Sequence, residues 1–273
     1  MEYFFFYLFL FLLGSSIGSF LNVLRFRLPK SFSIIKPRSF CPKCKTSIPF
    51  YLNIPIFSWF FLRGKCIFCK SKIPFSYPLI EFFTALLFVL NGFLSINHPS
   101  YYKLNLVGLN IFTGFLIIIS LIDFDKMIIP NKLIFVGSLL GLIFNFTFFY
   151  LLGNQSLLEF VFKFLFLPFI GAFCLEILNF IFSLIIKKDA FGFGDVKYLF
   201  MVGTWIGLNG QFLTFILSIY IGGLITLFLI IIKKISKKGK IPFGPYLSIS
   251  AYLVGIFGSE SIFLFFQKIY NLG

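Results

Sequence analysis

The sequence predicts an all-α polytopic membrane protein with about eight transmembrane helices. Of the 273 residues, 59% are hydrophobic and 12% are charged, and the mean hydropathy is +0.99. Soluble domains contain about 25% charged residues. The 46 Phe residues fit a surface that faces lipid. This composition excludes a soluble globular protein and indicates a chain that crosses the bilayer repeatedly.

Apolar stretches of roughly 20 residues are long enough to cross a bilayer as helices. We expect eight of them, of which the sixth is short enough to be a half-helix or a re-entrant piece. The first has neither a basic leader nor a small-residue cleavage site after it, so we expect a retained helix. The eight segments are Phe4–Leu24, Tyr77–Ile96, Leu104–Ile122, Leu133–Leu152, Phe160–Ile186, Val196–Gly207, Phe212–Ile232 and Tyr246–Phe266.

Basic residues predict the orientation of the chain. The net charge is +15, and 21 of the 24 Lys and Arg residues fall in four loops, at 25–76, 123–132, 187–197 and 233–240. In an eight-helix arrangement these loops share one side, which the positive-inside rule makes cytoplasmic, with both termini outside. Topology and contact with anionic lipid account for this charge. No nucleic-acid-binding module is recognisable, so nucleic acid is not an expected partner.

The long polar loop 25–76 divides the chain into two expected domains. It holds four of the five cysteines, six prolines, 11 basic residues and no acidic residue. We expect a first domain at 1–96, formed by two helices and this loop. The second, at 97–273, is expected to be a helical membrane core.

Two CxxC pairs in this loop predict a metal site. Cys41 and Cys44 are separated from Cys66 and Cys69 by 21 residues, and two such knuckles can close tetrahedrally around Zn²⁺. Thiols stay reduced in the cytoplasm, and a four-sulfur site is closed, so the expected role is structural. The alternatives are a loop of free thiols, or disulfides if the topology is inverted. Cys174 lies within an apolar segment and is expected to be a packing residue.

Two aspartates at hydrocarbon boundaries predict the chemistry. Asp123 ends the apolar run 116–122, and Asp195 lies in Phe-Gly-Phe-Gly-Asp at 191–195. Such charges cost a few kcal/mol unless they are paired, hydrated or protonated. On a helix, Asp125 points about 200° away from Asp123, so one of these two faces the bundle. Asp189 follows two lysines and is expected to form a solvated ion pair.

A pair of carboxylates that shares one proton can activate water and polarise a carbonyl group. This mechanism needs no nucleophilic side chain. The sole histidine, His98, falls in a predicted outside loop, so a Ser/His or Cys/His mechanism has little support. Gly192 and Gly194 permit a tight turn beside Asp195, although an acidic helix cap is the plainer alternative. The Pro-Phe-Gly-Pro break at 242–245 either shapes this site or simply interrupts a helix.

Ordered motifs along nearly the whole chain resemble those of the type IV prepilin peptidases, the bifunctional leader peptidase/N-methyltransferases of bacterial inner membranes. The resemblance covers Gly-Ser-Phe-Leu-Asn-Val at 18–23, Arg-Leu-Pro at 27–29, Pro-Arg-Ser at 37–39, both CxxC pairs, and Asn-Ile-Pro-Ile-Phe-Ser-Trp at 53–59. It also covers 62–66, 73–74, 77–78, Glu81, Asp123-x-Asp125-x-x-x-Ile-Pro-Asn at 123–131, Gly-Phe-Gly-Asp-Val-Lys at 192–197, and 242–245.

The resemblance implies an aspartyl peptidase that removes the basic leader of prepilins or pseudopilins at the cytoplasmic membrane face. Asp123 and Asp195 would be catalytic, with Asp125 as the alternative to Asp123. The resemblance alone also implies N-methylation with S-adenosylmethionine, for which Glu81, Asn22 and Arg27 are the candidate residues. The sequence departs from the family at two positions of the methylation-associated region.

These two departures are Ser76, where Arg often precedes the Tyr-Pro pair, and Lys45, where Gly often follows the first CxxC. Two functions of other classes remain open on the residues alone. A membrane scaffold would use the cysteine loop to dock a cytoplasmic partner, and its aspartates would be dispensable. A transporter would use the boundary aspartates as proton carriers.

Overall fold

The computed structural model describes residues 2–97, 106–147, 156–187, 191–232 and 241–270. The chain separates into two compact units, Met1–Pro99 and Ser100–Gly273. Each unit is described by itself below. The described residues are helical, apart from loops and two isolated β-bridges. His98, Asp189 and the basic run 233–240, which the sequence analysis singled out, lie outside the described residues.

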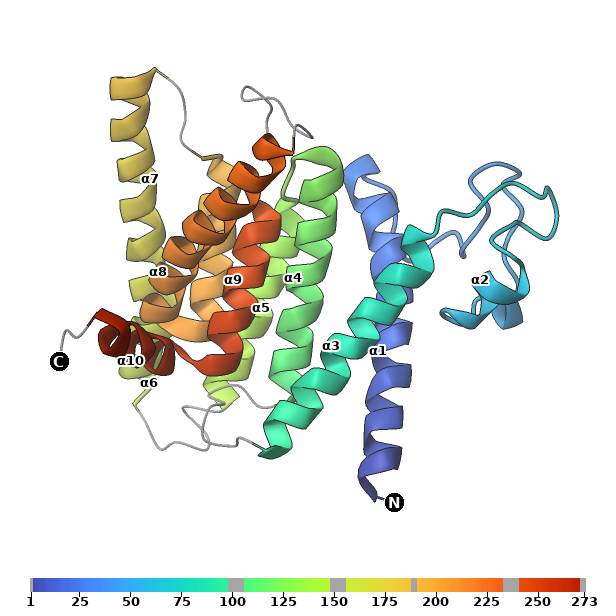
Figure 1. Cartoon of the computed structure of the whole chain (residues 1–273), viewed down its shortest axis with the longest axis horizontal. Helices are drawn as coiled ribbons and strands as arrows, with labels where there is room; N and C mark the ends of the chain where they lie inside the picture. Colours follow the sequence, from blue (N-terminus) through green and yellow to red (C-terminus); the bar gives the residue numbers. More distant parts are fainter. Residues whose placement is uncertain (1, 98–105, 148–155, 188–190, 233–240, 271–273) are drawn as a thin grey trace. The chain divides into compact units, whose positions relative to one another are not determined.

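The first unit is built on two helices, α1 (Glu2–Arg27) and α3 (Ser76–Asn97), which pack along each other (Figure 1). Two glycines one helical turn apart on α1 allow this close approach. A Cβ atom on Gly14 would lie 2.7 Å from Ala85 Cα, and one on Gly18 would lie 2.7 Å from Glu81 Cα. This small-xxx-small pattern packs membrane helices through backbone contact.

The connection between α1 and α3 contains η1 (Leu28–Lys30), η2 (Phe50–Leu52) and the short helix α2 (Phe57–Phe61). The buried side chain of Arg27, at the end of α1, organises its first part. The guanidinium donates to the main-chain oxygens of Ser33, Ile34, Pro37 and Arg38 at 2.7–3.3 Å. A single cation therefore satisfies carbonyl groups of a segment that has no regular structure of its own.

The second unit is a helical bundle. Its helices are α4 (Leu106–Lys126), α5 (Asn131–Asn145), α8 (Phe193–Ile231), α9 (Gly244–Phe257) and α10 (Ser259–Tyr270). A continuous stretch of α6 (Leu157–Val161), η5 (Phe162–Phe166) and α7 (Leu167–Ile186) packs against α8. Trp205 lies at the centre, between the rings of Phe112 and Phe144, and donates to Gly137 O at 2.9 Å.

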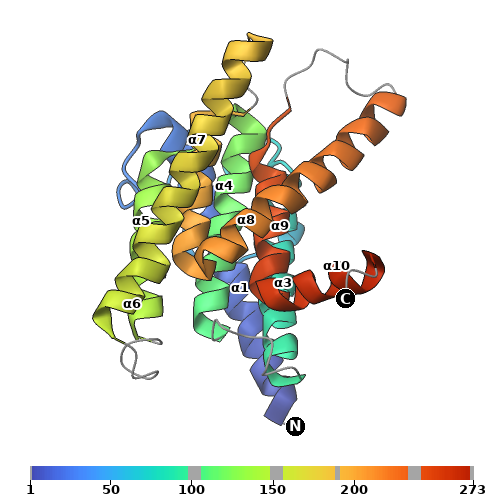
Figure 2. The ribbon, with the colours of Figure 1, turned by 90° about the vertical axis from the view of Figure 1, so that its left-hand side faces the viewer.

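Helix α8 is interrupted at Gly207, whose φ of 74° and ψ of 177° are not helical. In Figures 1 and 2 the ribbon reverses there, so both ends of α8 lie at the same end of the unit. The break removes partners from the carbonyl groups of the preceding turn. Asn145 supplies new ones, because its Nδ2 donates to Thr204 O at 2.8 Å and to Trp205 O at 3.0 Å. Buried carbonyl groups must be satisfied in this way where no water is present.

The expected count of eight transmembrane helices is not confirmed. Five described helices are long and apolar enough to cross a membrane, and two apolar helices, Asn131–Asn145 and Gly244–Phe257, are shorter. The expected sixth and seventh segments are the two halves of α8 on either side of Gly207. The expected eighth segment ends at Gly258 (φ 75°), after which α10 runs in a different direction from α9 (Figure 1).

Candidate active site, metal centre and cavity

Asp123 lies in the last turns of α4, with its carboxylate turned into the bundle. Its side chain is 6% exposed. The N–H of Gly244, at the start of α9, donates to Asp123 Oδ2 at 2.8 Å. A Cβ atom at residue 244 would lie 2.7 Å from the same oxygen, so glycine is required for this approach. The Pro-Phe-Gly-Pro segment at 242–245 therefore places the main-chain N–H of Gly244 within hydrogen-bond distance of the buried carboxylate of Asp123.

Asp195 occupies the first turn of α8 and is 8% exposed. The N–H of Gly192 donates to its Oδ2 at 3.0 Å, and the N–H of Asp195 donates back to Gly192 O at 2.9 Å. The sequence thus forms the acidic helix cap that we gave as an alternative, and a carboxylate is favourable at a helix N-terminus. This cap does not exclude a chemical role, because the capping carboxylate is also within electrostatic reach of Asp123.

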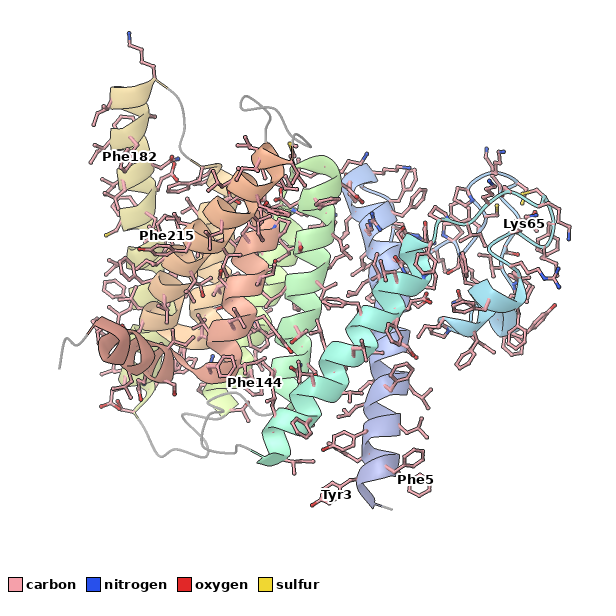
Figure 3. The ribbon with its side chains drawn as sticks, in the orientation of Figure 1. Tyr3, Phe5, Lys65, Phe144, Phe182 and Phe215 are labelled. Carbon is pink, nitrogen blue, oxygen red and sulfur yellow. The ribbon has the colours of Figure 1, made fainter. Side chains whose placement is uncertain are left out.

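The two carboxylates belong to the same end of the second unit. The C-terminal end of α4 and the N-terminal ends of α8 and α9 meet there (Figures 1 and 3). Asp125 has an exposed side chain, as do its neighbours Phe124 and Lys126. Of the two aspartates at the end of α4, Asp123 is the one that the structure brings to Asp195.

Residues that the sequence analysis did not single out support this pair. Ser248 lies one turn after Gly244, and its Oγ is 2.9 Å from Gly244 O and 3.0 Å from Leu116 O. The hydroxyl of Tyr198, one turn after Asp195, is 2.7 Å from the same Oγ. Both side chains are buried, and together they link α4, α8 and α9 beside the carboxylates.

A second set of contacts involves residues on either side of Asp195 in the sequence, Phe191 and Lys197. The buried amide of Asn179, on α7, pairs with the main chain of Phe191: its Nδ2 donates to Phe191 O at 3.0 Å and its Oδ1 accepts from Phe191 N at 3.3 Å. Lys197 Nζ, in the first turns of α8, donates to Asn131 Oδ1, at the start of α5, at 3.2 Å. Single polar residues in apolar runs give little sequence signal, so only tertiary structure identifies these contacts.

The four predicted cysteine ligands converge. The sulfur atoms of Cys41, Cys44, Cys66 and Cys69 all lie within 4.8 Å of one another, and those of Cys41 and Cys69 are 3.8 Å apart. A tetrahedral site with Zn–S bonds of about 2.3 Å requires sulfur atoms roughly 3.8 Å apart. The cluster can therefore bind a metal ion.

The two knuckles have the same main-chain geometry. In the first, Cys41 N donates to Thr46 O and Lys45 N to Cys41 O; in the second, Cys66 N donates to Ser71 O and Lys70 N to Cys66 O. Lys45 and Lys70 both have positive φ, 58° and 56°. Glycine adopts this conformation at lower cost, which is a physical reason for glycine to follow a CxxC pair more often than the lysine found here at position 45.

The thiol of Cys41 is prepared to act as a ligand. The pKa of Cys41 is lowered from 9.0 to about 6, mainly because its sulfur accepts a hydrogen bond from the main-chain N–H of Cys44. Thiolates are the form of cysteine that binds metals. A donor set of four sulfurs with this geometry suits Zn²⁺ and leaves no open coordination position.

The first unit also contains a cavity of about 250 Å³ between α1, α3 and the loop. Glu81 lies on its wall and accepts a hydrogen bond from Ile56 N at 2.6 Å. Asn22 donates to Tyr77 O at 3.1 Å, while its buried Oδ1 has no partner. Aromatic rings, among them Phe26 and Trp59, provide apolar surface. The guanidinium of Arg27 also borders the cavity, and its Nη1 and Nη2 atoms donate to the four loop carbonyl groups.

Comparison with known proteins covers most of the chain. Residues 12–94 match the family described as "Bacterial Peptidase A24 N-terminal domain", and residues 110–227 match the "Type IV leader peptidase family". Relatives named "Prepilin leader peptidase/N-methyltransferase" occur in Aeromonas salmonicida, Pseudomonas aeruginosa and Neisseria gonorrhoeae.

These relatives are 30%, 31% and 32% identical to the chain. The alignments cover 92%, 91% and 89% of this chain and 90%, 89% and 87% of the relatives. No solved structure matches the chain significantly.

Proposed function

The chain belongs to the type IV leader peptidase family, and on this premise we propose that it is a prepilin peptidase and N-methyltransferase of the bacterial inner membrane. It removes the basic leader of prepilins or pseudopilins at the cytoplasmic face and methylates the new N-terminus. The observation that carries the peptidase proposal is the burial of Asp123 and Asp195 at one end of the bundle, each held by the N–H of a glycine.

Hydrolysis follows from two carboxyl groups that share one proton. The ionised member takes a proton from water as the water oxygen attacks the scissile carbonyl carbon. The protonated member donates its proton to the carbonyl oxygen, which gives a tetrahedral intermediate. This intermediate collapses as the leaving amine gains a proton. In both residues the glycine N–H binds Oδ2, so we assign the Oδ1 atoms to the water and the substrate.

A comparison of three variants tests the assignment. We expect Asp123→Asn and Asp195→Asn to abolish leader removal, because an amide cannot replace either partner in the proton exchange. Asp125→Asn is the matched control on the same helix, and it should cleave at a rate close to that of the parent protein. The measurement is the mass of a prepilin after incubation with each membrane-inserted variant. Leader removal by Asp195→Asn, or its loss in Asp125→Asn alone, would contradict the assignment.

We assign methylation to the first unit, because its cavity offers hydrogen-bond acceptors and apolar surface of the kind that S-adenosylmethionine requires. The cofactor when bound supplies an electrophilic methyl group on a cationic sulfur. The orphaned Asn22 Oδ1 and the Glu81 carboxylate offer acceptors for a cationic ligand, and Phe26 and Trp59 offer apolar surface for an adenine ring. In this assignment Arg27 shapes the cavity through the loop and does not bind the cofactor directly.

Binding measurements test the cavity separately from the reaction. Glu81→Gln keeps an acceptor oxygen but removes the negative charge, so we expect it to weaken S-adenosylmethionine binding by about tenfold or more, in keeping with hydrogen bonds to charged groups worth about 1.5–3 kcal/mol. Equilibrium dialysis with labelled cofactor provides the readout, and prepilin cleavage provides the folding control. Unchanged binding by Glu81→Gln, with cleavage intact, would place the cofactor elsewhere.

The metal in the cysteine cluster is proposed to be Zn²⁺ with a structural role. Cys41 and Cys66 are buried beside the cavity wall, which both residues help to form. A closed four-sulfur site cannot hold water or substrate at the metal. Its contribution to the reactions is therefore to fold the segment that encloses the cavity.

A further inference from the structure

The connection between α1 and α3 carries a group of exposed aromatic and aliphatic side chains, which we call the aromatic tip. Phe50 is 81% exposed and Phe61 is 84% exposed. Residues 46–62 contain no charged side chain. Soluble proteins rarely expose contiguous apolar surface of more than a few hundred Å², and larger patches indicate a partner or a membrane. The tip consists of Phe50, Tyr51, Ile54, Phe57, Phe60 and Phe61.

The orientation of the tip is fixed by its inner face. Trp59 donates through Nε1 to Ile73 O at 3.1 Å, and its ring packs against Phe75. The N–H of Ile56 donates to Glu81, which ties the tip to α3. Ile56 also has a φ of 65°, a conformation that a β-branched residue adopts only where its surroundings impose it. The outward direction of Phe60 and Phe61 is thus part of the fold of this unit.

The tip lies level with the membrane-spanning part of its own unit. In Figure 1, α2 is level with the first turns of α3, below the end of α1 from which the loop leaves. Lys65 lies on the other side of the loop, above α2 (Figure 3). Helices α1 and α3 are both candidate membrane spans by length and composition, so a bilayer that they cross would lie beside the tip.

We propose that the aromatic tip inserts into the headgroup–acyl boundary of the bilayer that α1 and α3 cross, in the leaflet from which their connecting loop emerges. Charge complementarity favours lipid over a protein partner here, because the loop at 25–76 carries 11 basic residues and no acidic one. Aromatic residues flanked by Lys and Arg are typical of segments that lie in the interface of anionic membranes. Basic residues near such a surface add an electrostatic attraction to anionic lipid. The proposal does not depend on either enzymatic activity.

Photocrosslinking of the full chain tests this proposal. p-Benzoylphenylalanine is introduced at Phe50 or at Phe61, and each protein is reconstituted into vesicles of phosphatidylcholine and phosphatidylglycerol. The matched control is Phe68, which is 53% exposed but belongs to the second CxxC knuckle and not to the tip. After illumination, mass spectrometry identifies what is attached to each site.

We expect phospholipid adducts at positions 50 and 61, several-fold above those at 68, and a lower yield when phosphatidylglycerol is omitted. Crosslinks from 50 and 61 to a second copy of the chain, or to residues 106–270 of the same chain, would identify a protein surface as the occupant and overturn the proposal. Equal lipid adducts at 61 and 68 would overturn it too, since contact with lipid would then not be specific to the tip. Prepilin cleavage by each protein confirms that it is folded.

Discussion

At Asp123 a main-chain N–H takes the place of water that the buried carboxylate gives up. Gly244 can donate at 2.8 Å because it has no side chain, and Ser248 holds the following turn through Gly244 O. Tyr198 fixes Ser248 from a helix that also carries Asp195. The position of the Asp123 carboxylate thus depends on contacts from three helices, which makes the proposed site sensitive to small displacements.

Replacement of Gly244 by Ala is expected to reduce leader cleavage strongly without unfolding the protein. The added Cβ would lie 2.7 Å from Asp123 Oδ2 and 3.0 Å from its Cβ, so the carboxylate must move. Displacements of about 1 Å can reduce catalysis about 100-fold. The measurement is the rate of prepilin cleavage at saturating substrate, with S-adenosylmethionine binding as a check on the first unit.

Gly223→Ala is the matched control for this variant. A Cβ at residue 223 meets no atom within 4 Å, although the residue lies in α8 of the same unit. Its cleavage rate should stay close to that of the parent protein. Equal losses in both variants would mean that helix packing in general, and not the contact with Asp123, limits the rate.

At the scale of single residues, the sequence points to the two acidic residues but not to the residues that hydrogen-bond around them. The boundary position of Asp123, the glycines before Asp195 and the 200° rotation to Asp125 were all readable. Tyr198 and Ser248 were not, because their importance arises from a hydrogen bond between residues 50 positions apart. Asn179 is a similar case, since its partner Phe191 lies 12 positions away in the sequence.

Among the elements, the two CxxC knuckles were the most predictable, because each is local and the same main-chain hydrogen bonds recur in both. Helix α8 was less predictable. Its hydrophobicity runs through residues 193–231, and the reversal depends on one glycine and on an Asn145 that caps it from another helix. Apolar length alone therefore does not show where the chain turns within residues 193–231, and the count of eight crossings stays unconfirmed.

Removal of the metal is expected to disorder residues 41–69 while leaving leader cleavage largely intact. Without the ion, four sulfur atoms within 4.8 Å lose their common partner, and the described loop has little regular structure to replace it. The reduced protein should contain one zinc per chain by elemental analysis. Chelation should make the loop sensitive to limited proteolysis and reduce S-adenosylmethionine binding, because Cys41 and Cys66 border the cavity.

A Cys41→Ser, Cys44→Ser double variant gives the same comparison without a chelator, and Cys174→Ser is its control, because Cys174 lies outside the cluster. Loss of cleavage before loss of cofactor binding would reverse the order that the two-unit arrangement predicts. Absence of zinc from protein purified under reducing conditions would reject the metal assignment itself.

The whole molecule combines two units with separate sites, and chemistry sets the order in which they act. The carboxylate pair lies in residues 100–273 and the cavity in residues 1–99. The expected division at residues 96 and 97 rested on the position of the long loop, and its functional meaning stays a proposal. N-methylation needs a free α-amine, which the substrate acquires only when the leader has been removed. If the proposed assignment of the two sites holds, cleavage in the second unit must therefore precede methyl transfer in the first.

This order predicts complementary behaviour of two variants. Asp195→Asn should leave an intact prepilin both uncleaved and unmethylated, yet it should methylate a pilin whose leader has already been removed, because its cavity is unchanged. Glu81→Gln should release an unmethylated product from the same prepilin. The mass of the product N-terminus, measured with and without S-adenosylmethionine, distinguishes these outcomes. If Asp195→Asn binds the cofactor but cannot methylate the precleaved pilin, the two sites are not separable, and Asp195 must take part in both reactions.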